Sequence, residues 1–242
     1  MASPKYSAER FKRYENVFDE RTIKFLFKLS SEGYFEGLAE PVALGKEANI
    51  FVGEQEDGHK VIVKIYRVEN SNFNNMAYYI AGDPRFDTIV NHRRKIVKAW
   101  VQREYRNLLL ARDYLRVPTP YAFRENVLVM EHIGEHRPAP QLKDVDLQDP
   151  ERFWRHTKRS IKKLLDAGLV HGDLSQFNIL YNRNKPVFID MGQSTPITST
   201  KSQDLFERDI KNITKFFKRH IDVNKEKEEL HKLFLQKREE QR

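Results

Sequence analysis

The sequence contains no cysteine among its 242 residues, which excludes disulfide bonds, thiolate zinc sites and cysteine nucleophiles. It also lacks long apolar runs, and no stretch approaches the roughly 20 apolar residues that a membrane-spanning helix needs. The first 20 residues are polar and charged and have no apolar segment typical of a secretory signal. We therefore expect a soluble, cytoplasmic protein with no membrane partner.

The composition is that of a folded protein with a heavily charged surface. Hydrophobic residues make up 39% of the chain, enough for a core, and charged residues make up 32%. The length suits one two-lobed domain or two small ones. The formal net charge of +8 favours anionic partners such as nucleotides, RNA or phosphoproteins, although solubility alone explains it equally well.

The hydrophobic pattern of the first third predicts one helix followed by an antiparallel meander. Apolar residues recur at helical spacing from Asn16 to Leu29, before a Ser-Ser and Gly break. The following runs alternate in the manner of strands, with a turn at Asp57–Gly58. The predicted strands cover residues 42–44, 50–53 and 61–66.

In the rest of the chain, the pattern of apolar and turn-forming residues predicts helices, two more strands and two irregular segments. Residues 70–93 are rich in Asn and contain a Gly-Asp-Pro break, which predicts a long loop with one helical turn. Pro, Gly and charge at 134–150 predict a linker. Strands are predicted at 121–123 and 127–130, and helices at 95–114, 153–167, 204–219 and 226–242. The last helix is either a docked or fraying tail or a partner-binding helix.

The densest group of candidate catalytic and metal-binding residues lies in HGDLSQFNIL at 171–180 and VFID at 187–190. Asn178 follows Asp173 by five residues, and Asp190 follows Asn178 by twelve. Flanking apolar runs predict a hairpin that brings Asn178 and Asp190 together. An amide oxygen and a carboxylate, with phosphate oxygens and water, form the shell that Mg²⁺ prefers. The spacing is typical of phosphoryl transfer, although either aspartate taken singly would fit an ordinary loop.

Lys64 stands in the middle of the β-branched run VIVKIY. Burying an ionised lysine there costs free energy unless a partner compensates. A strand lysine that reaches the α- and β-phosphates of ATP, paired with a helix glutamate, meets this requirement. Glu104 is the only acid in the interior of the predicted helix at 95–114, so it is the candidate partner. The alternative is an edge-strand lysine whose amine reaches water.

Two further segments suit a nucleotide. Gly45 allows a tight turn between two strands, where Lys46 and the turn amides would lie over phosphates, although one glycine is not a full glycine-rich pattern. The run VLVMEHIG at 127–134 enters the predicted linker and offers backbone donors and acceptors to an adenine edge. Met130 would lie at the back of that pocket, and an ordinary core strand is the alternative.

The order and the sequences of these motifs resemble those of the RIO family of atypical serine kinases, in its type-one branch. The matching strings span roughly residues 40–215. HGDL with a later Asn and Asp also fits aminoglycoside and choline kinases, whereas GKEAN, VKIYR and GDPRFD are more specific. The absence of long acidic or basic tails favours an archaeal source. The strings are GKEANIF, VKIYR, GDPRFD, EYRNLLLAR, MEHIG, HGDLSQFN, FIDMGQS and ERDIKNI.

The resemblance implies an α+β, two-lobed, protein-kinase-like fold. It comprises a small antiparallel-sheet N-lobe and a mainly helical C-lobe, without an activation loop or peptide-docking subdomains. The expected domains are an N-terminal helical extension over 1–40, an N-lobe over 41–133 and a C-lobe with C-terminal helices over 134–242. Residues 70–93 resemble the flexible loop that characterises the family.

The resemblance also implies roles for single residues. Asp173 is similar to the catalytic aspartate that orients or deprotonates the acceptor, and Asn178 and Asp190 are similar to the magnesium ligands. Asp190 is further expected to carry an aspartyl-phosphate during ATP hydrolysis. Lys64 is similar to the phosphate-anchoring lysine, with Glu104 as its structural ion-pair partner.

The remaining members of the expected ATP site lie in the turn and the hinge. The cofactors implied are ATP and Mg²⁺, with Mn²⁺ as a substitute. Together with Lys64 and Asn178, the expected ATP-binding residues are Gly45, Lys46, Glu47, Ala48, Asn49, Met130, Glu131 and Ile133.

The function implied is an ATP-dependent serine/threonine kinase and ATPase that phosphorylates itself. Ser71 and Thr88 are candidate acceptors, and nothing in the spacing selects either. The family is associated with late maturation of the small ribosomal subunit. The pre-ribosomal small subunit, its rRNA or its proteins are therefore the expected partners, and DNA is not expected.

Departures from ordinary protein kinases leave other functions open. His-Gly-Asp at 171–173 replaces H-R-D, Met191 replaces the Phe of D-F-G, and no A-P-E follows, which argues against a general peptide kinase. A small-molecule phosphotransferase of the aminoglycoside or choline kinase type would need an acceptor pocket from the roughly fifty residues after Asp190. An RNA-binding pseudokinase scaffold would predict loss of Lys64, Asp173 or Asp190, and none is lost.

Overall fold

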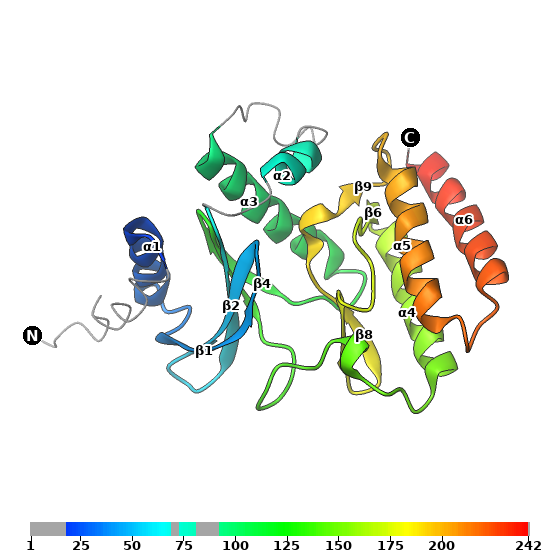
Figure 1. The fold of residues 1–242 in the computed structure, drawn as a ribbon. Coiled ribbons are helices and arrows are strands. Elements are labelled where there is room, and N and C mark those ends of the chain that lie inside the picture. Colours follow the sequence, from blue (N-terminus) through cyan, green and yellow to red (C-terminus); the bar gives the residue numbers. More distant parts are fainter. Residues whose placement is uncertain (1–17, 69–72, 81–91, 242) are drawn as a thin grey trace, which may run out of the picture. The chain divides into compact units, whose positions relative to one another are not determined.

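The computed structural model describes residues 18–68, 73–80 and 92–241 of the chain (Figure 1). The chain divides into two compact units, Met1–Tyr105 with Thr119–His132, and Arg106–Pro118 with Ile133–Arg242. The chain passes from the first unit to the second between Tyr105 and Arg106, so this boundary lies inside a helix and not in a loop. The predicted division into an extension, an N-lobe and a C-lobe stays a prediction.

The first unit contains a five-stranded antiparallel sheet in the order β1-β2-β3-β5-β4. β3 is the central strand, paired with β2 on one side and β5 on the other. Gly58 adopts a φ of +82° in the turn between β2 and β3, where the sequence predicted a turn. The strands are β1 (Gly37–Leu44), β2 (Ala48–Glu54), β3 (Lys60–Tyr66), β4 (Pro120–Arg124) and β5 (Val127–Glu131).

Helix α1 (Glu20–Ser31) packs one apolar face against this sheet. Asp19 caps its N-terminus by accepting a hydrogen bond of 2.8 Å from a backbone N–H of the first turn, so the helix begins later than predicted. Leu26 and Leu29 are buried in one cluster with Val63 of β3. Burial of each such side chain contributes about 1.5–3 kcal/mol, which makes this face the core of the unit.

Helix α2 (Phe73–Ile80) is longer than the single turn predicted within residues 70–93. Its low-propensity asparagines are compensated by packing, because Met76 and Tyr79 are buried. The fully buried Arg103 donates a hydrogen bond of 2.5 Å to the carbonyl of Tyr79, which joins α2 to the next helix. Ser71 and Thr88 lie outside the described residues.

Helix α3 (Arg93–Ala111) matches the long helix that the sequence predicted. Its predicted core residues Ile96, Trp100, Leu108 and Ala111 are all buried. The helix contributes its first part to the first unit and its last turns to the second.

The second unit is mainly helical, with two short hairpin-like pairings. α4, α5 and α6 run beside one another in Figure 1, and α4 contacts both α6 and β8. Asp149 caps α4 by accepting a hydrogen bond of 2.9 Å from the N–H of Arg152. The elements are η3 (Leu142–Asp144), α4 (Pro150–Asp166), β6 (Leu169–Val170), β7 (Ile179–Asn182), β8 (Lys185–Phe188), η4 (Met191–Gln193), β9 (Thr195–Pro196), α5 (Ser202–Phe217) and α6 (Val223–Glu240).

The C-terminal helix is docked. Leu230 and Phe234 of α6 have no exposed surface, and the Phe234 ring stacks on Phe206 of α5 with centroids 4.7 Å apart. Glu229 also forms ion pairs of 2.9 Å with Lys158 and with Lys162 of α4. Of the two alternatives for this helix, the docked tail is therefore the one that the structure supports.

The predicted linker is partly structured. Gly134 forms an isolated bridge with Pro138, and Gln141 forms one with Leu180. Leu142 is completely buried. This segment therefore packs as part of the second unit instead of running free as a linker.

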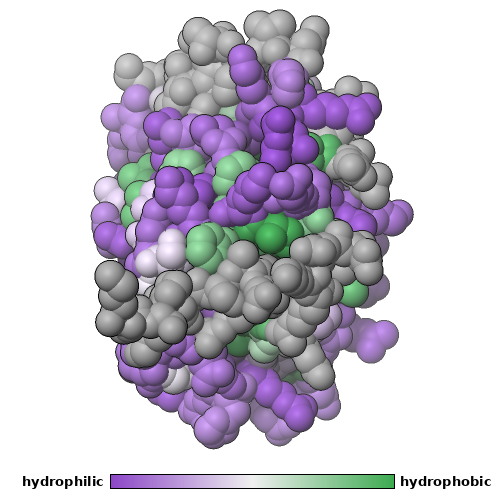
Figure 2. Space-filling view, turned by 90° about the vertical axis from the view of Figure 1, so that its left-hand side faces the viewer, coloured by the Kyte–Doolittle hydropathy of each residue, from purple (hydrophilic) through white to green (hydrophobic). Residues whose placement is uncertain are grey.

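On the face shown in Figure 2, most of the described residues are hydrophilic, and hydrophobic residues show between them. Within the described residues, none of the helices combines the length and the apolar character that a membrane crossing requires.

Candidate active site

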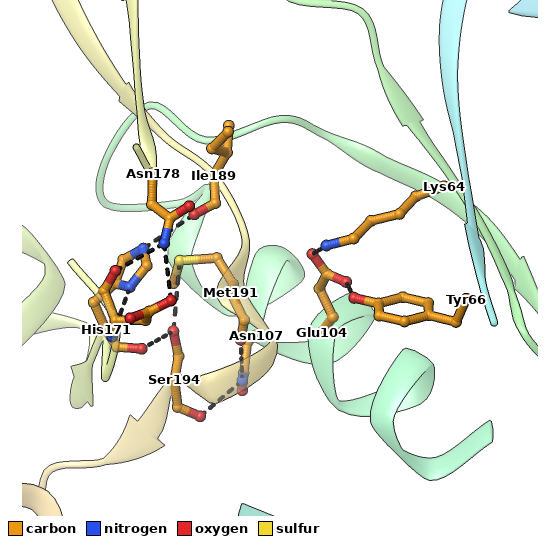
Figure 3. Close-up of polar contacts among 10 residues, drawn as sticks. Lys64, Tyr66, Glu104, Asn107, His171, Asn178, Ile189, Met191 and Ser194 are labelled. Atoms are coloured by element: carbon orange, nitrogen blue, oxygen red, sulfur yellow. Dashed lines mark hydrogen bonds and ion pairs between the residues drawn. The ribbon is translucent and has the colours of Figure 1, made fainter. Parts of the chain in front are cut away.

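Lys64 extends from β3 into a buried ion pair with Glu104 of α3 (Figure 3). Its Nζ lies 2.8 Å from Oε1 of Glu104, and the exposed fractions of the two side chains are 7% and 1%. Successive strand residues point to opposite faces, so Lys64 lies on the face opposite to that of Val63. Removal of either charge would leave the other buried without its ion-pair partner.

Tyr66 completes this arrangement. Its hydroxyl donates a hydrogen bond to Oε2 of Glu104, and Nζ of Lys64 lies 5.0 Å from the centroid of its ring. Two residues of one strand thus hold one helix carboxylate. Sequence reasoning missed Tyr66, although its position two residues after Lys64 places it on the same face of the strand.

The turn between β1 and β2 carries the next expected phosphate-binding residues. The N–H of Gly45 donates to the carbonyl of Ala48 at 3.0 Å, and a Cβ on Gly45 would lie 2.9 Å from that oxygen. The tight turn therefore requires glycine. Lys46 and Glu47 are exposed at its tip, whereas Asn49 is buried on β2.

The expected hinge residues lie at the end of β5 and beyond it. Met130 and Ile133 are buried. The N–H of Glu131 donates to the carbonyl of Thr119 at 2.8 Å, and its carboxylate accepts from the N–H of Thr119 at 3.1 Å. The carbonyl of Ile133 accepts from Ala139 at 2.7 Å. These contacts fix the backbone on which the expected adenine contacts depend.

In the second unit, Asp173 and Asn178 lie on the loop between β6 and β7. Nδ2 of Asn178 donates to the carbonyl of Asp173 at 2.8 Å and to its Oδ2 at 3.1 Å. One amide group therefore fixes both the backbone and the carboxylate of Asp173. Both side chains are partly exposed.

His171 supports this loop as a neutral side chain. Its Nε2 lies 3.1 Å from the carbonyl of Ile189, and its Nδ1 accepts from the N–H of Asp173 at 3.3 Å. Burial lowers the pKa of His171 to about 4, against the opposing effect of Asp190. A proton on Nε2 satisfies both contacts, so the imidazole holds the loop and is neutral at neutral pH.

Asp190 follows β8 at the end of the predicted hairpin. β7 and β8 pair antiparallel, and the N–H of Ile189 extends the pairing by donating to the carbonyl of Asn178 at 3.0 Å. Asp190 is exposed and adopts φ 61° and ψ 63°, an uncommon conformation for a residue other than glycine. The hairpin thus brings the backbones of Asn178 and Ile189 together immediately before Asp190.

Asn107 holds the turn that follows Asp190. From the last turns of α3, its Nδ2 donates to the carbonyls of Met191 at 2.9 Å and of Ser194 at 2.8 Å (Figure 3). The hydroxyl of Ser194 donates in turn to the carbonyl of His171 at 3.0 Å. This chain of hydrogen bonds connects the loop of His171 to the turn after Asp190.

Asp209 of α5 holds the loop on both sides of Asp173. Its two carboxylate oxygens accept from the N–H of Gly172 at 2.7 Å and of Leu174 at 2.8 Å. Burial raises the pKa of Asp209 to about 7, and the two hydrogen bonds oppose that rise. Gly172 has a φ of +82°, and a Cβ there would lie 2.7 Å from the carbonyl of Gln193, so the loop requires glycine.

The oxygen atoms of Asn178 and Asp190 fit Mg²⁺. Because Nδ2 of Asn178 donates hydrogen bonds to Asp173, Oδ1 is the atom of this side chain that can act as a ligand. The described residues include no cluster of three or more His, Cys, Asp or Glu that would form a fuller metal site. Mg²⁺ commonly uses one or two protein ligands together with phosphate oxygens and water, so this sparse oxygen set suits it.

Comparison with known proteins supplies the family. A family model described as the RIO domain matches residues 49–230. The chain belongs to the RIO family. An RIO-type serine/threonine-protein kinase Rio1 of Methanocaldococcus jannaschii is 42% identical over 89% of this chain and 75% of its own length. The Haloferax volcanii protein of the same name is 38% identical over 88% of this chain and 74% of its own.

The RIO assignment confirms the resemblance seen in the motifs and makes the chain a protein kinase. A solved Rio2 kinase from Chaetomium thermophilum, described as an ADP/Mg²⁺-phosphoaspartate complex, has a TM-score of 0.67. It is 20% identical, and the match covers 87% of this chain and 66% of that one. The likeness confirms the predicted α+β, kinase-like fold.

Sequence reasoning missed the residues that position the loop of Asp173 and the turn after Asp190. Asn107 and Asp209 lie inside the strings EYRNLLLAR and ERDIKNI, which carried the resemblance but received no roles. Their partners lie 84 and 37 residues away along the chain. Polar residues on otherwise apolar helix faces were the available signal.

Proposed function

We propose that this RIO kinase uses ATP with Mg²⁺ both to phosphorylate serine or threonine, including its own, and to hydrolyse ATP. The observation that carries the proposal is the hydrogen-bonded arrangement of Asp173 and Asn178 beside the strand pair that precedes Asp190. Asp209 and His171 fix that arrangement from buried positions.

Each expected site residue has a place in this proposal. Lys64 contacts the α- and β-phosphates, and Glu104 holds Lys64. The adenine contacts Met130, Glu131 and Ile133. The phosphates lie under the turn formed by Gly45, Lys46, Glu47, Ala48 and Asn49.

The proposed lobes run over 41–133 and 134–242, after an extension over 1–40.

The transfer step uses Asp173 as the base. The hydroxyl oxygen of the acceptor bonds to the γ-phosphorus while the bond to the β–γ bridging oxygen breaks, and ADP leaves. The carboxylate of Asp173 receives the hydroxyl proton. Asn178 keeps that carboxylate in place. Asn178 and Asp190 would hold Mg²⁺, which would supply positive charge that offsets the charge of the phosphate oxygens, and we expect Mn²⁺ to replace it.

ATP hydrolysis proceeds through Asp190 in this proposal. A carboxylate oxygen of Asp190 bonds to the γ-phosphorus and ADP leaves. Water then cleaves the acyl phosphate, which restores the carboxylate and releases inorganic phosphate. The Rio2 structure described with phosphoaspartate supports this route by analogy.

The biological role that we propose is maturation of the small ribosomal subunit. The support is the association of the family with that process and the net charge of +8, which suits an RNA-rich partner. Ser71 and Thr88 are the candidate acceptors of autophosphorylation.

The test follows γ-labelled ATP with Mg²⁺ and purified protein, measuring released phosphate and protein-bound label. We expect label that hydroxylamine removes, as an acyl phosphate requires, and no such label in Asp190→Asn. Hydroxylamine-resistant label on residues 70–93 would mark serine or threonine transfer. Asp146→Asn, an exposed carboxylate of the second unit, is the matched control. ATP binding without either product would contradict the proposal.

A further inference from the structure

A pocket of about 410 Å³ in the second unit lies apart from the residues assigned to catalysis. It is formed by α4, the β7–β8 hairpin and the segment after α3. The N–H of Phe188 in β8 donates to the carbonyl of Arg116 at 3.2 Å, which fixes that segment against the hairpin. The volume falls within the range of roughly 300–1,000 Å³ that is typical of ligand sites.

The lining of this pocket is strongly basic. None of its eleven lining residues is acidic. Five lining residues are exposed Lys or Arg, and they come from three separate chain segments: Arg116, Arg159, Lys163, Arg183 and Lys185. We call this set the basic pocket.

Some of these cations already have contacts. Arg183 pairs with Glu135 at 2.9 Å, but both side chains are more than two-thirds exposed, so solvent weakens that pair. Arg116 donates to the carbonyl of Val117 at 3.1 Å. Arg159 and Lys163 lie four residues apart on α4 and so occupy one face of that helix.

His156 lines the same pocket. Burial is the largest cause that lowers the pKa of this histidine, and the charges of Arg159, Arg152, Lys185 and Arg155 lower it further. A lining with several positive charges favours binding of an anion with several charges.

We propose that the basic pocket binds the phosphate backbone of single-stranded RNA. The proposal names the surface through which the proposed ribosomal role would operate, and the choice of RNA as the physiological partner rests on that role. Binding of an anion follows from the pocket alone, because its lining contains cations and no acid.

Three features favour RNA over an acidic protein segment. A phosphodiester chain carries a regular series of negative charges and no positive ones, which matches a wall of cations from several segments. Guanidinium planes such as that of Arg159 stack on unpaired bases. Asn182 and Ser160, also in the lining, offer neutral donors and acceptors to a ribose hydroxyl or a base edge.

The test compares two triple variants by fluorescence anisotropy with a labelled single-stranded RNA of mixed sequence. Arg159→Ala, Lys163→Ala and Lys185→Ala together remove three cations from the basic pocket. Lys211→Ala, Lys215→Ala and Lys218→Ala remove the same charge from exposed positions in and directly after α5. All six side chains are exposed, so both variants are expected to keep the wild-type unfolding curve.

We expect the pocket variant to lose roughly 100-fold in RNA affinity near 0.1 M salt, and the slope of log affinity against log salt to fall by about two. The α5 variant is expected to lose no more than about threefold, from net charge alone. An equal loss in both variants would overturn the proposal, as would a wild-type chain that does not bind RNA. Displacement of RNA by polyglutamate as effectively as by unlabelled RNA would assign the pocket to an acidic protein instead.

A measurement on the wild-type chain gives an independent answer. Bound RNA should protect Lys163 and Lys185 from acetylation and leave Lys211 and Lys215 reactive, and the reverse pattern would contradict the proposal. ATP turnover is measured in the same preparations and should be unchanged in the pocket variant. Loss of turnover in every preparation would defeat the proposed function alone, whereas unprotected pocket lysines would defeat this inference alone.

Discussion

The two units hold their candidate catalytic residues in opposite ways. In the first unit, Lys64 and Glu104 form a pair that is almost completely buried. In the second unit, Asp173 and Asn178 are partly exposed and Asp190 is exposed, and the buried polar groups are the supporting ones, including Asp209. Substitution of the first set should therefore affect stability and ATP binding together. Substitution of Asp173 in the second set should affect phosphoryl transfer alone.

The largest expected effect is that of Asp173→Asn. The amide cannot accept the hydroxyl proton, so transfer to a serine or threonine hydroxyl should fall by about 10⁴-fold. ATP affinity and the free energy of unfolding should stay near the wild-type values, because the side chain is partly exposed. Hydroxylamine-resistant protein-bound label, ATP titration and urea unfolding measure the three quantities. Retained transfer to a hydroxyl would show that Asp173 has another role.

Lys64→Met should show the opposite pattern. It leaves the carboxylate of Glu104 buried without its cation, which costs about 3 kcal/mol of unfolding free energy, and ATP affinity should fall as well. Adding Glu104→Gln removes the buried negative charge and keeps an acceptor for the hydroxyl of Tyr66. The double variant should regain most of the stability while ATP affinity stays low. A Lys64→Met chain as stable as wild type would contradict the comparison between the two units.

Asp209→Asn tests the positioning of the loop. The amide offers one acceptor oxygen to the two N–H groups of Gly172 and Leu174, so one buried donor loses its partner. We expect a loss of about 2 kcal/mol in unfolding free energy. Turnover should fall about tenfold with ATP affinity unchanged, because a misplaced loop mainly affects the transition state. Asp204→Asn, exposed on the same helix, is the control, and equal turnover in both variants would exclude a positioning role.

The smallest effect is expected at the contact between α4 and α6. Hydrogen bonds from Lys158 and Lys162 lower the pKa of Glu229 from 4.5 to about 2. A carboxylate with a lowered pKa adds stability above its unfolded value, and that stability is lost as the pH falls toward 2. Because the side chain is 42% exposed, screening limits the contribution to less than about 1 kcal/mol.

Glu229→Gln should therefore be slightly less stable than wild type at neutral pH and equal to it near pH 2. Glu228→Gln, whose partner Lys232 lies on the same helix, is the matched control and should show less effect in urea unfolding. A difference that persists at the acid limit would show that packing, and not charge, is the cause.

Strands β2 to β5 and the long helices were predictable because their signals are local, whereas only the end of β1 was predicted and β6 and β9 were not. The hairpin of β7 and β8 follows from two short apolar runs close together in the chain, and α3 follows from a long helical period. The length of α2 was not predictable in this way. Its asparagines disfavour a helix, and contacts such as that between Tyr79 and Arg103 of α3 compensate for them.

The same distinction applies to the candidate site. Asp173, Asn178 and Asp190 stand at short, readable offsets, and Glu104 was found because it is the only interior acid of its helix. Asp209 and Asn107 act through hydrogen bonds across 37 and 84 residues, which no local pattern encodes. The basic pocket likewise combines residues from three chain segments that no motif connects.

The most direct test of the account is ADP formation by the wild-type chain at saturating ATP and Mg²⁺. ADP counts every transfer of the γ-phosphate, whether the acceptor is a hydroxyl, the carboxylate of Asp190 or water. The account predicts several ADP molecules for each protein molecule, and no ADP formation once a chelator removes Mg²⁺. Tight ATP binding with no ADP formed would contradict it and leave the chain as a nucleotide-binding scaffold.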